Sequence, residues 1–375
     1  MTPELRIQTA TLLAWMRDAA LPFWAEVQEQ SGAWPEDLFP DGTPHTRAVR
    51  RHRVQARQLF TYALATDRGW YDGKAIVARS LAYIWEAGLH PDPEAKGLIH
   101  RVNADGTVAS ARQDLYDHAF YALGTAWAGH VLGQDAIRPA MNRLDRFFDD
   151  LRHPRGGFRE GIPEDPFRRQ NPHMHLFEMM LHLHELNQHF TLSGLRGLTR
   201  ESLYALFETR FFDPARGMVR EYFDPDWTPR DTPFEPGHAV EWVWLLGWWE
   251  RQSGTSTRHY RDALYASALG SGAIWLFDEV EPGEHGWQPA RETSRLWVQT
   301  ELAKAHLTQA EHGERGAADM AALAIEGLLK DWLEPRGTWI DKRGACGQVL
   351  SETIPTSTFY HIAGLVAEAE RVSRL

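Results

Sequence analysis

The feature that most constrains the fold is a helix start that recurs six times along the chain. At each start, a polar loop rich in Pro and Gly gives way to apolar residues at helical spacing. The six starts lie near Thr46, Asp114, Asn171, His238, Ser294 and Pro355. Their spacing of roughly 60 residues indicates one supersecondary unit that is repeated along the chain. Asn171-Pro172 is typical of such a start, since Asn caps a helix and Pro is tolerated at its first position.

A second helical pattern follows each start before the next one begins. These second helices cover about Lys74–Ala87, Ile137–Leu151, Thr199–Phe211, His259–Leu276 and Ala317–Leu333, and an N-terminal helix at Glu4–Gln28 supplies the sixth partner. Twelve helices in six pairs predict an all-α chain folded as an (α/α)6 barrel, in which alternate helices line the interior. We expect the helices at the six recurring starts to be the inner ones, because they carry polar and aromatic residues that an outer layer does not need.

Three of the loops that lead into the inner helices are unusually long. They are Arg152–Gln170, Gly217–Pro233 and Gly337–Thr353. Structured loops of this length are often functional, and each of these precedes the N-terminus of an inner helix, so they should gather at one mouth of the barrel. Short strands are expected there, at 217–223 and 337–341. No stretch resembles an interdomain linker, so residues 1–375 are predicted to form a single catalytic domain.

Composition excludes several classes of partner. The chain of 375 residues has a formal net charge of −11 and no basic block, which disfavours nucleic-acid binding. Its single cysteine, Cys346, excludes an intrachain disulfide and fits a reducing compartment. Charged residues interrupt the N-terminal apolar stretch, and the apolar run around Trp242–Trp249 is too short for a membrane span. We expect a cytoplasmic protein, monomer or homodimer, with no nucleic-acid or membrane partner.

The starts of the inner helices are rich in side chains that could carry chemistry. His238 and Glu241 are three residues apart and share one helix face, so Glu241 could accept a proton from one imidazole nitrogen and fix the tautomer at the other. The helix dipole at this N-terminus disfavours the imidazolium, so His238 is predicted to be a neutral general base. His175 and Glu178 repeat the same spacing.

A structural role is the simpler interpretation of many such residues. A histidine near a helix start is usually a cap or a satisfied polar group, and we interpret His173, His182 and His184 in that way. A His–Glu pair on one face is more often a surface ion pair. The recurrence of His, Arg, Glu or Gln at one phase of several inner helices favours a lined pocket, because a closed core would bury many charges at high cost.

The 18 histidines make a metal site the main competing prediction. The chain has no His-Glu-x-x-His pair and no cysteine cluster. His173 and His175 are two residues apart, so their rings leave a helix on divergent faces. No glycine-rich nucleotide loop is present either. We therefore expect no metal and no cofactor.

The motifs at the inner-helix starts together resemble a known family. The segments that carry the resemblance are Arg53–Gln58, Asp114–Phe120, Asn171–Glu178, Glu235–Trp242, Arg295–Glu301 and Ser357–His361. In this order, over nearly the whole chain, they resemble the N-acylglucosamine 2-epimerase superfamily. Within it, the chain is most similar to the bacterial D-mannose isomerases and their sulfoquinovose-isomerase relatives. The resemblance implies the same (α/α)6 barrel, with a sugar site at one mouth.

The resemblance also implies roles for individual residues. His238 and His361 match the two acid/base histidines of the family. The residues that match positions lining the sugar site are His175, Glu241 and Arg57, and further sugar contacts are Tyr116, Asn171, Trp297 and Glu301.

These residues permit an aldose–ketose isomerisation through a cis-enediol. We expect His361 to move a proton between C2 and C1, and His238, oriented by Glu241, to assist ring opening. Arg57 would stabilise the enediolate oxygen. The expected substrate is a free monosaccharide, D-mannose or a relative such as D-lyxose, which becomes D-fructose or the matching ketose, since Lys and Arg are not clustered for a phosphate. A sugar 2-epimerase, and a glycosidase or sugar-binding protein on the same fold, are the alternatives.

Overall fold

The computed structural model describes residues 2–186, 198–271 and 275–375. The chain divides into two compact units. Unit 1 comprises Met1–Trp24, Phe211–Glu221 and Asp231–Leu375, and unit 2 comprises Ala25–Arg210 and Tyr222–Arg230. The single domain expected over residues 1–375 stays a prediction. Among the described residues, no helix is both long and apolar enough to cross a membrane.

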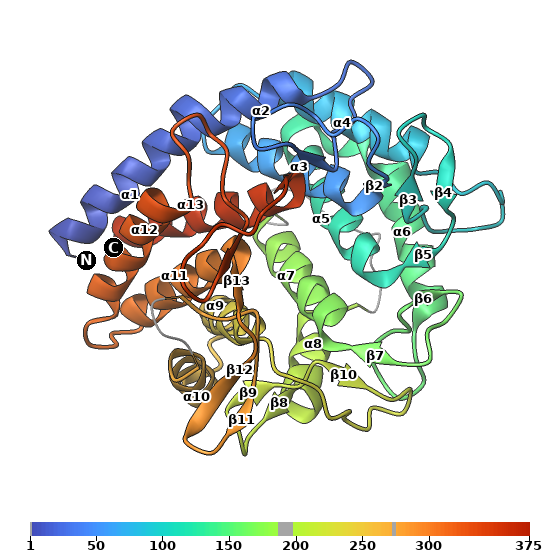
Figure 1. The fold of residues 1–375 in the computed structure, drawn as a ribbon. Coiled ribbons are helices and arrows are strands. Elements are labelled where there is room, and N and C mark those ends of the chain that lie inside the picture. The colour runs from blue at the N-terminus through green and yellow to red at the C-terminus, as the bar shows by residue number, and fades with distance from the viewer. Residues whose placement is uncertain (1, 187–197, 272–274) are drawn as a thin grey trace. The chain divides into compact units, whose positions relative to one another are not determined.

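Unit 2 is built from pairs of helices. These are α3 (His52–Asp67), α4 (Lys74–Ala87), α5 (Leu115–Leu132), α6 (Arg138–Leu151), α7 (Gln170–Leu186) and α8 (Arg200–Leu206). α3, α5 and α7 lie side by side (Figure 1). α4 packs on α3 and α5, α6 packs on α5, and α8 packs on α7, so each interior helix has an outer partner.

Unit 1 repeats this arrangement. Its helices are α1 (Pro3–Trp15), α9 (Pro236–Ser253), α10 (Arg258–Leu269), α11 (Leu296–Glu311), α12 (Ala317–Asp331) and α13 (Phe359–Ser373). α11 lies between α9 and α13, while α10 packs on α9, α12 on α11, and α1 on α12 and α13 (Figure 1). A π-helical turn, Met16–Ala20, joins α1 to α2 (Leu21–Val27), and the boundary between the units falls within α2.

The loops of both units carry short strands, most of which form antiparallel ladders. The strands of unit 2 are β1 (Asp37–Leu38), β2 (Arg50–Arg51), β3 (Arg101–Val102), β4 (Val108–Ser110), β5 (Gln113–Asp114), β6 (Gly161–Ile162), β7 (Arg168–Arg169) and β10 (Tyr222–Phe223). Those of unit 1 are β8 (Phe212–Asp213), β9 (Met218–Val219), β11 (Glu279–Gly283), β12 (Gly286–Arg291), β13 (Thr293–Arg295), β14 (Lys342–Gly344) and β15 (Ile354–Pro355). β13 pairs with β14 and runs directly into α11, so this ladder fixes the start of an interior helix.

The ends of α9 show how the sequence limits a helix. Pro236 occupies the first position, where its missing N–H removes no helical hydrogen bond. Gly254 follows the last residue with φ of 73°, a left-handed conformation that glycine adopts without strain, and its N–H bonds the carbonyl oxygen of Glu250. The helix that carries His238 therefore has well-defined limits at both ends.

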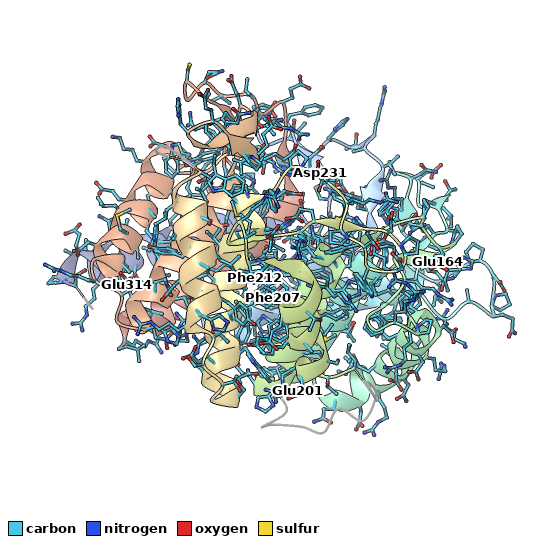
Figure 2. All side chains as sticks on the ribbon, turned by 90° about the horizontal axis from the view of Figure 1, so that it is seen from below. Glu164, Glu201, Phe207, Phe212, Asp231 and Glu314 are labelled. Carbon is cyan, nitrogen blue, oxygen red and sulfur yellow. The ribbon has the colours of Figure 1, made fainter. Side chains whose placement is uncertain are left out.

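The two kinds of helix differ in how many faces they bury. α6 is amphipathic and buries a single stripe that includes Met141, Leu144 and Phe147. α5 instead buries every residue from Asp117 to Gly129, as an interior helix must. Outer elements keep charged side chains at the surface: Glu201 on α8 is exposed (Figure 2). α3, α7, α9, α11 and α13 are buried on nearly all faces, like α5.

The fourth residue of four interior helices anchors the loop that precedes the helix. Gln55 accepts a bond of 2.7 Å from the backbone N–H of Trp34 and donates one of 2.9 Å to its carbonyl. Gln299 binds a loop residue through the same two bonds, whereas His118 and His173 each accept one loop N–H through Nε2. Burial lowers the pKa of His118 to about 4 and that of His173 to about 3, so both rings are neutral acceptors. Some of the recurring polar residues that favoured a pocket therefore have a structural role.

Most helix limits predicted from the sequence are confirmed, and α4 spans Lys74–Ala87 as expected. The first start is wrong: α3 begins at His52, not near Thr46, because Arg50–Arg51 form β2 and pair with β3. The predicted helix 259–276 corresponds to α10, which ends at Leu269, and residues 272–274 of that range lie outside the described residues.

Two further local predictions need correction. Asn171 does not cap its helix, since α7 already begins at Gln170 and Asn171 lies in the first turn. The strand expected at 337–341 is displaced: Trp339 forms a single bridge with Leu333, and the strand itself is β14. The other predicted stretch, 217–223, does contain two short strands, β9 and β10.

Candidate active site

The residues predicted to form the site occupy one face of the interior helices. Each is the second, third or sixth residue of its helix. The second residues are Tyr116, Asn171 and Trp297, the third are His238 and His361, and the sixth are Arg57, His175, Glu241 and Glu301. Positions two and three each lie about one helical turn before position six, so they flank it on one face. Position four, which carries the loop anchors, points about 160° away from position six, and this separates structural from candidate functional residues.

In unit 1, one indole contacts both predicted acid/base imidazoles. The ring of Trp297 on α11 lies 5.3 Å from that of His238 on α9 and 5.6 Å from that of His361 on α13, between centroids. Both histidines are buried and the tryptophan is half-buried. The three neighbouring interior helices therefore bring two imidazoles within reach of one small molecule.

The carboxylate that orients His238 is Glu221. Nδ1 of His238 lies 2.9 Å from Oε2 of Glu221 and 3.9 Å from Oε2 of Glu235. The sequence predicts Glu241 in this role, and that prediction is wrong, because the loop before α9 delivers Glu221 to the ring. Glu221 is 17 residues from His238, so no helical spacing signals the contact.

The protonation state expected for His238 also needs correction. Burial lowers the pKa of His238, but the charges of Glu221 and Glu235 outweigh burial and raise it to about 10. Burial raises the pKa of Glu235 itself, which makes Glu221 the main counter-charge. The effect of the two carboxylates on the pKa of His238 is thus larger than the opposite effect of the helix dipole. At neutral pH His238 is an imidazolium, an acid rather than the neutral base that its place at a helix start predicts.

His361 has a different environment. Its Nδ1 lies 2.8 Å from Oε1 of Glu301, and Oε2 of Glu301 lies 2.6 Å from Nζ of the buried Lys304. Glu301, predicted as a sugar contact, is therefore brought to His361, and a cation shares its charge. Lys304 was missed by the sequence prediction, although its position three residues after Glu301 on one helix face is a visible signal.

Two groups of atoms in unit 1 are close enough to hold a metal ion. Within each group, the nitrogen and oxygen atoms lie within 4.8 Å of one another. The groups are Glu221, Glu235 and His238, and Glu241, Glu301 and His361. In the first, Arg295 lies 3.7 Å from Glu235, and in the second Lys304 pairs with Glu301. Since protein cations already neutralise carboxylates in both groups, they fit proton transfer better than metal binding.

Unit 2 gathers three of the predicted sugar-binding residues. Nη2 of Arg57 on α3 donates to the Tyr116 hydroxyl on α5 over 2.7 Å, and the Tyr116 ring lies 5.2 Å from that of His175 on α7. Nδ1 of His175 bonds Glu178 at 2.8 Å, the pair predicted from spacing. Asn171 is half-buried at the second position of α7. This cluster therefore combines a cation, an aromatic ring and a carboxylate-bound imidazole on three interior helices.

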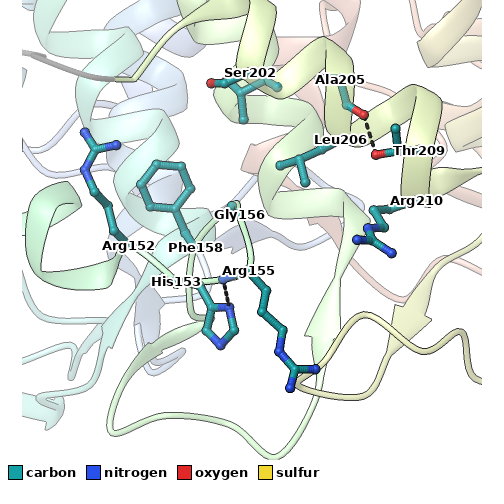
Figure 3. A pocket seen from close by; sticks show the side chains of 12 residues that line it. Arg152, His153, Arg155, Gly156, Phe158, Ser202, Ala205, Leu206, Thr209 and Arg210 are labelled. Atoms are coloured by element: carbon teal, nitrogen blue, oxygen red, sulfur yellow. Dashed lines mark hydrogen bonds between the residues drawn. The ribbon is translucent and has the colours of Figure 1, made fainter.

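A separate cavity opens on unit 2 between the loop that precedes β6 and helix α8 (Figure 3). Its volume is about 400 Å³. Phe158 and Leu206 line its apolar side, and Arg152, Arg155 and Arg210 contribute cationic groups. None of the predicted site residues lines this cavity.

Replacing Glu221 with Gln is expected to lower the pKa of His238. A raised pKa means that protonated His238 adds stability below its unfolded pKa of 6.5, and that this stability is lost as pH rises through about 10. The variant should therefore lose less stability between these pH values than the wild type, and its His238 ring should titrate at lower pH by NMR. Glu235→Gln, which removes the more distant carboxylate, is the matched control and should have the smaller effect. An unchanged titration in Glu221→Gln would contradict the assignment.

Comparison with known proteins shows which family the chain belongs to. The model of the N-acylglucosamine 2-epimerase family matches residues 34–365. The chain belongs to this family. As an N-acylglucosamine 2-epimerase family member, the protein is a sugar isomerase or epimerase.

Individual relatives in the N-acylglucosamine 2-epimerase family are similar over different shares of the chain. A mannose-6-phosphate isomerase from Rhizobium meliloti (strain 1021) is 34% identical over 99% of this chain and 98% of that protein. A D-mannose isomerase from Thermobifida fusca is 28% identical over 59% of this chain and 57% of that protein. A crystal structure of D-mannose isomerase has a TM-score of 0.83 at 16% identity and covers 96% of this chain and 97% of that one. This likeness confirms the predicted fold, an (α/α)6 barrel with short strands.

Proposed function

We propose that this protein is an aldose–ketose isomerase that converts free D-mannose to D-fructose, and related aldoses such as D-lyxose to the matching ketose. The observation that carries the proposal is the placement of two imidazoles against one indole, each with Nδ1 bonded to a carboxylate. A carboxylate on Nδ1 orients each ring and tunes its basicity, so that Nε2 is the nitrogen that exchanges a proton with a substrate. A half-buried tryptophan beside them offers a flat face on which a sugar can stack.

The two imidazoles have different electrostatic surroundings, which suits an acid and a base. His238 faces Glu221 and Glu235 and is protonated at neutral pH, so it can donate a proton to the ring oxygen O5 as the C1–O5 bond breaks and the O1 hydroxyl gives up its proton to solvent. His361 is bonded to Glu301, whose charge Lys304 shares, and it acts as the base. It takes the C2 proton, which exchanges with solvent on the imidazole, and delivers a proton to C1, while the O2 hydroxyl loses a proton and O1 gains one. The roles of Glu241, Arg57, Tyr116, Asn171 and His175 as substrate contacts stay predictions.

The charges of unit 1 favour a neutral sugar over a sugar phosphate. Carboxylates outnumber cations around the two imidazoles in the part of unit 1 that the structure describes. These carboxylates are Glu221, Glu235, Glu241 and Glu301. Arg295 is already paired with Asp278 at 3.1 Å, and Lys304 with Glu301. A phosphate group needs cations that are not already engaged, and it would be repelled by these carboxylates.

Two alternatives keep specific support. The relative at 34% identity is named a mannose-6-phosphate isomerase, which makes D-mannose 6-phosphate the second candidate substrate. The family name makes a 2-epimerase the second candidate reaction. Membership in this family favours either reaction over the glycosidase or the sugar-binding protein that the fold alone would allow.

Incubation in D2O with D-mannose, D-lyxose and D-mannose 6-phosphate tests the proposal. An isomerase gives a ketose that carries deuterium at C1, whereas a 2-epimerase gives D-glucose that carries deuterium at C2, and NMR distinguishes these products. We expect D-fructose from D-mannose, at a higher kcat/KM than for the phosphate. Glucose as the first product, or turnover of the phosphate alone, would overturn the proposal.

A further inference from the structure

Lys304 is a buried cation that takes no direct part in the proposed isomerisation. It lies on α11, the ninth residue of that helix, and its side chain is 2% exposed. Its Nζ lies 2.6 Å from Oε2 of Glu301, one helical turn away. Removing an ammonium and a carboxylate from water costs several kcal/mol each, and an ion pair repays this only with good geometry. A buried pair beside a candidate catalytic histidine therefore invites a functional explanation.

A second contact holds the ammonium group in place. Nζ of Lys304 lies 3.4 Å from the ring centroid of Trp244, which belongs to α9. A desolvated cation over an indole is stabilised by the negative face of the ring. The group is thus fixed between the aromatic ring of one interior helix and the carboxylate of the next, which restricts where Oε2 of Glu301 can lie.

The ion pair continues to the imidazole. The other oxygen of Glu301, Oε1, lies 2.8 Å from Nδ1 of His361 on α13. Trp244, Lys304, Glu301 and His361 thus form one connected series across the three interior helices of unit 1. We propose that Lys304 is a positioning residue: it keeps Glu301 a correctly oriented carboxylate, so that Nδ1 of His361 keeps its proton and Nε2 is the basic nitrogen. This inference rests on the proposed function, because it explains how His361 stays a base.

The electrostatic reason follows from the charges around His361. Glu301 bonds its Nδ1, and Glu241 on α9 lies within 4.8 Å of the same group of atoms. Two carboxylates without a cation would favour the imidazolium, as Glu221 and Glu235 do at His238. Lys304 opposes them at His361, so one ring is kept as an acid and the other as a base.

Other charged groups near this series are already paired. Glu368 on α13 is within electrostatic range of Lys304, and it bonds Arg371 at 2.7 Å and 3.0 Å. Arg371 in turn bonds Glu311 of α11. His238 is linked to this series by the Trp297 ring, which contacts both His238 and His361. Lys304 is therefore the cation that lies against Glu301 in the described part of unit 1.

Lys304→Met, which replaces the ammonium by an apolar group of similar length, tests the proposal. In a plot of kcat/KM against pH, the rise on the acid side (the acid limb) marks the loss of a proton from His361. This rise should move to higher pH by about 1–2 units in the variant, because a cation that opposed the imidazolium has been removed. Histidine ¹⁵N NMR without substrate should show the same shift in the titration of His361. A neutral His361 ring with its proton on Nε2 would also support the proposal. In that case Glu301, without Lys304 beside it, would have taken up a proton and would donate it to Nδ1. Lys330→Met, at an exposed lysine of α12, is the matched control.

A double-mutant cycle separates positioning from packing. If Lys304 acts through Glu301, then Lys304→Met should have little further effect on kcat in a Glu301→Gln background. Lys304→Arg, which keeps the charge, should retain the wild-type tautomer of His361. A variant that is less stable but keeps the wild-type acid limb and His361 titration would overturn the proposal and leave Lys304 a structural residue. If the wild type converts no sugar, the proposed function fails, yet the NMR titration still decides the role of Lys304.

Discussion

His361→Asn is expected to lower kcat for the conversion of D-mannose to D-fructose by about 10²–10⁴, the usual cost of removing a general acid or base. Asn can still donate an N–H to Glu301, so the buried carboxylate keeps both a hydrogen bond and its pairing with Lys304. What the variant lacks is the basic Nε2 that takes the C2 proton. The loss should therefore fall on kcat much more than on KM.

Exchange of the C2 proton with solvent measures this step directly. In D2O the wild type should incorporate deuterium into product and recovered substrate, and His361→Asn should incorporate almost none. Circular dichroism and thermal melting establish that the variant is folded. Asn171→Ala, at a predicted sugar contact, is a useful comparison, because loss of a binding group should raise KM and spare exchange at saturation. A folded His361→Asn protein that exchanges the C2 proton at the wild-type rate would refute the assignment of the base.

The helical repeat was predictable because it depends on local features. Helix starts and apolar periodicity are encoded within a few residues, and α4 matches its predicted limits for that reason. The first start was misplaced because Arg50–Arg51 form a ladder with Arg101–Val102, a distant segment. That pairing satisfies backbone groups of Arg50 and Arg51 in a strand, and it delays the helix to His52. Long-range pairing of this kind leaves no trace in the local sequence.

The sequence was enough to predict which candidate site residues share a helix face, but not which groups they contact. The third and sixth positions of the interior helices carry His238, His361, Glu241 and Glu301, and the helical period places them on one face. The identity of the counter-charges depends on tertiary structure. Glu221 comes from the loop before α9, and it reverses the protonation state that the helix dipole alone predicts for His238.

The roles of the recurring polar residues of the interior helices could also be assigned only from the structure. Gln55, His118, His173 and Gln299 share a phase with each other and bind loop backbone, one position away from candidate site residues such as His238 and His361. Position four points about 160° away from position six, so a polar residue is a loop anchor at one position and a candidate site residue at the other. Without the limits of each helix, the sequence cannot assign a residue to either face.

His238→Asn should reduce the conversion of D-mannose by about 10²–10⁴, and much less that of a triose such as D-glyceraldehyde. A triose is too short to close a furanose or pyranose ring, so it does not need an acid that protonates a ring oxygen. The imidazolium of His238, held by Glu221 and Glu235, is the group placed to donate this proton. The ratio of the two kcat/KM values therefore measures ring opening separately from proton transfer at C2.

Stability has to be controlled in this experiment, because the substitution leaves buried carboxylates without their cation. Breaking a buried pair in this way costs about 3–5 kcal/mol, and the carboxylates would partly relieve it by taking up protons. The double variant Glu221→Gln/His238→Asn removes the main counter-charge together with the imidazolium, and it should recover much of the lost stability without recovering turnover of D-mannose. Equal losses for mannose and glyceraldehyde in this folded double variant would show that His238 does not act in ring opening, and would place it in the proton transfer at C2 beside His361.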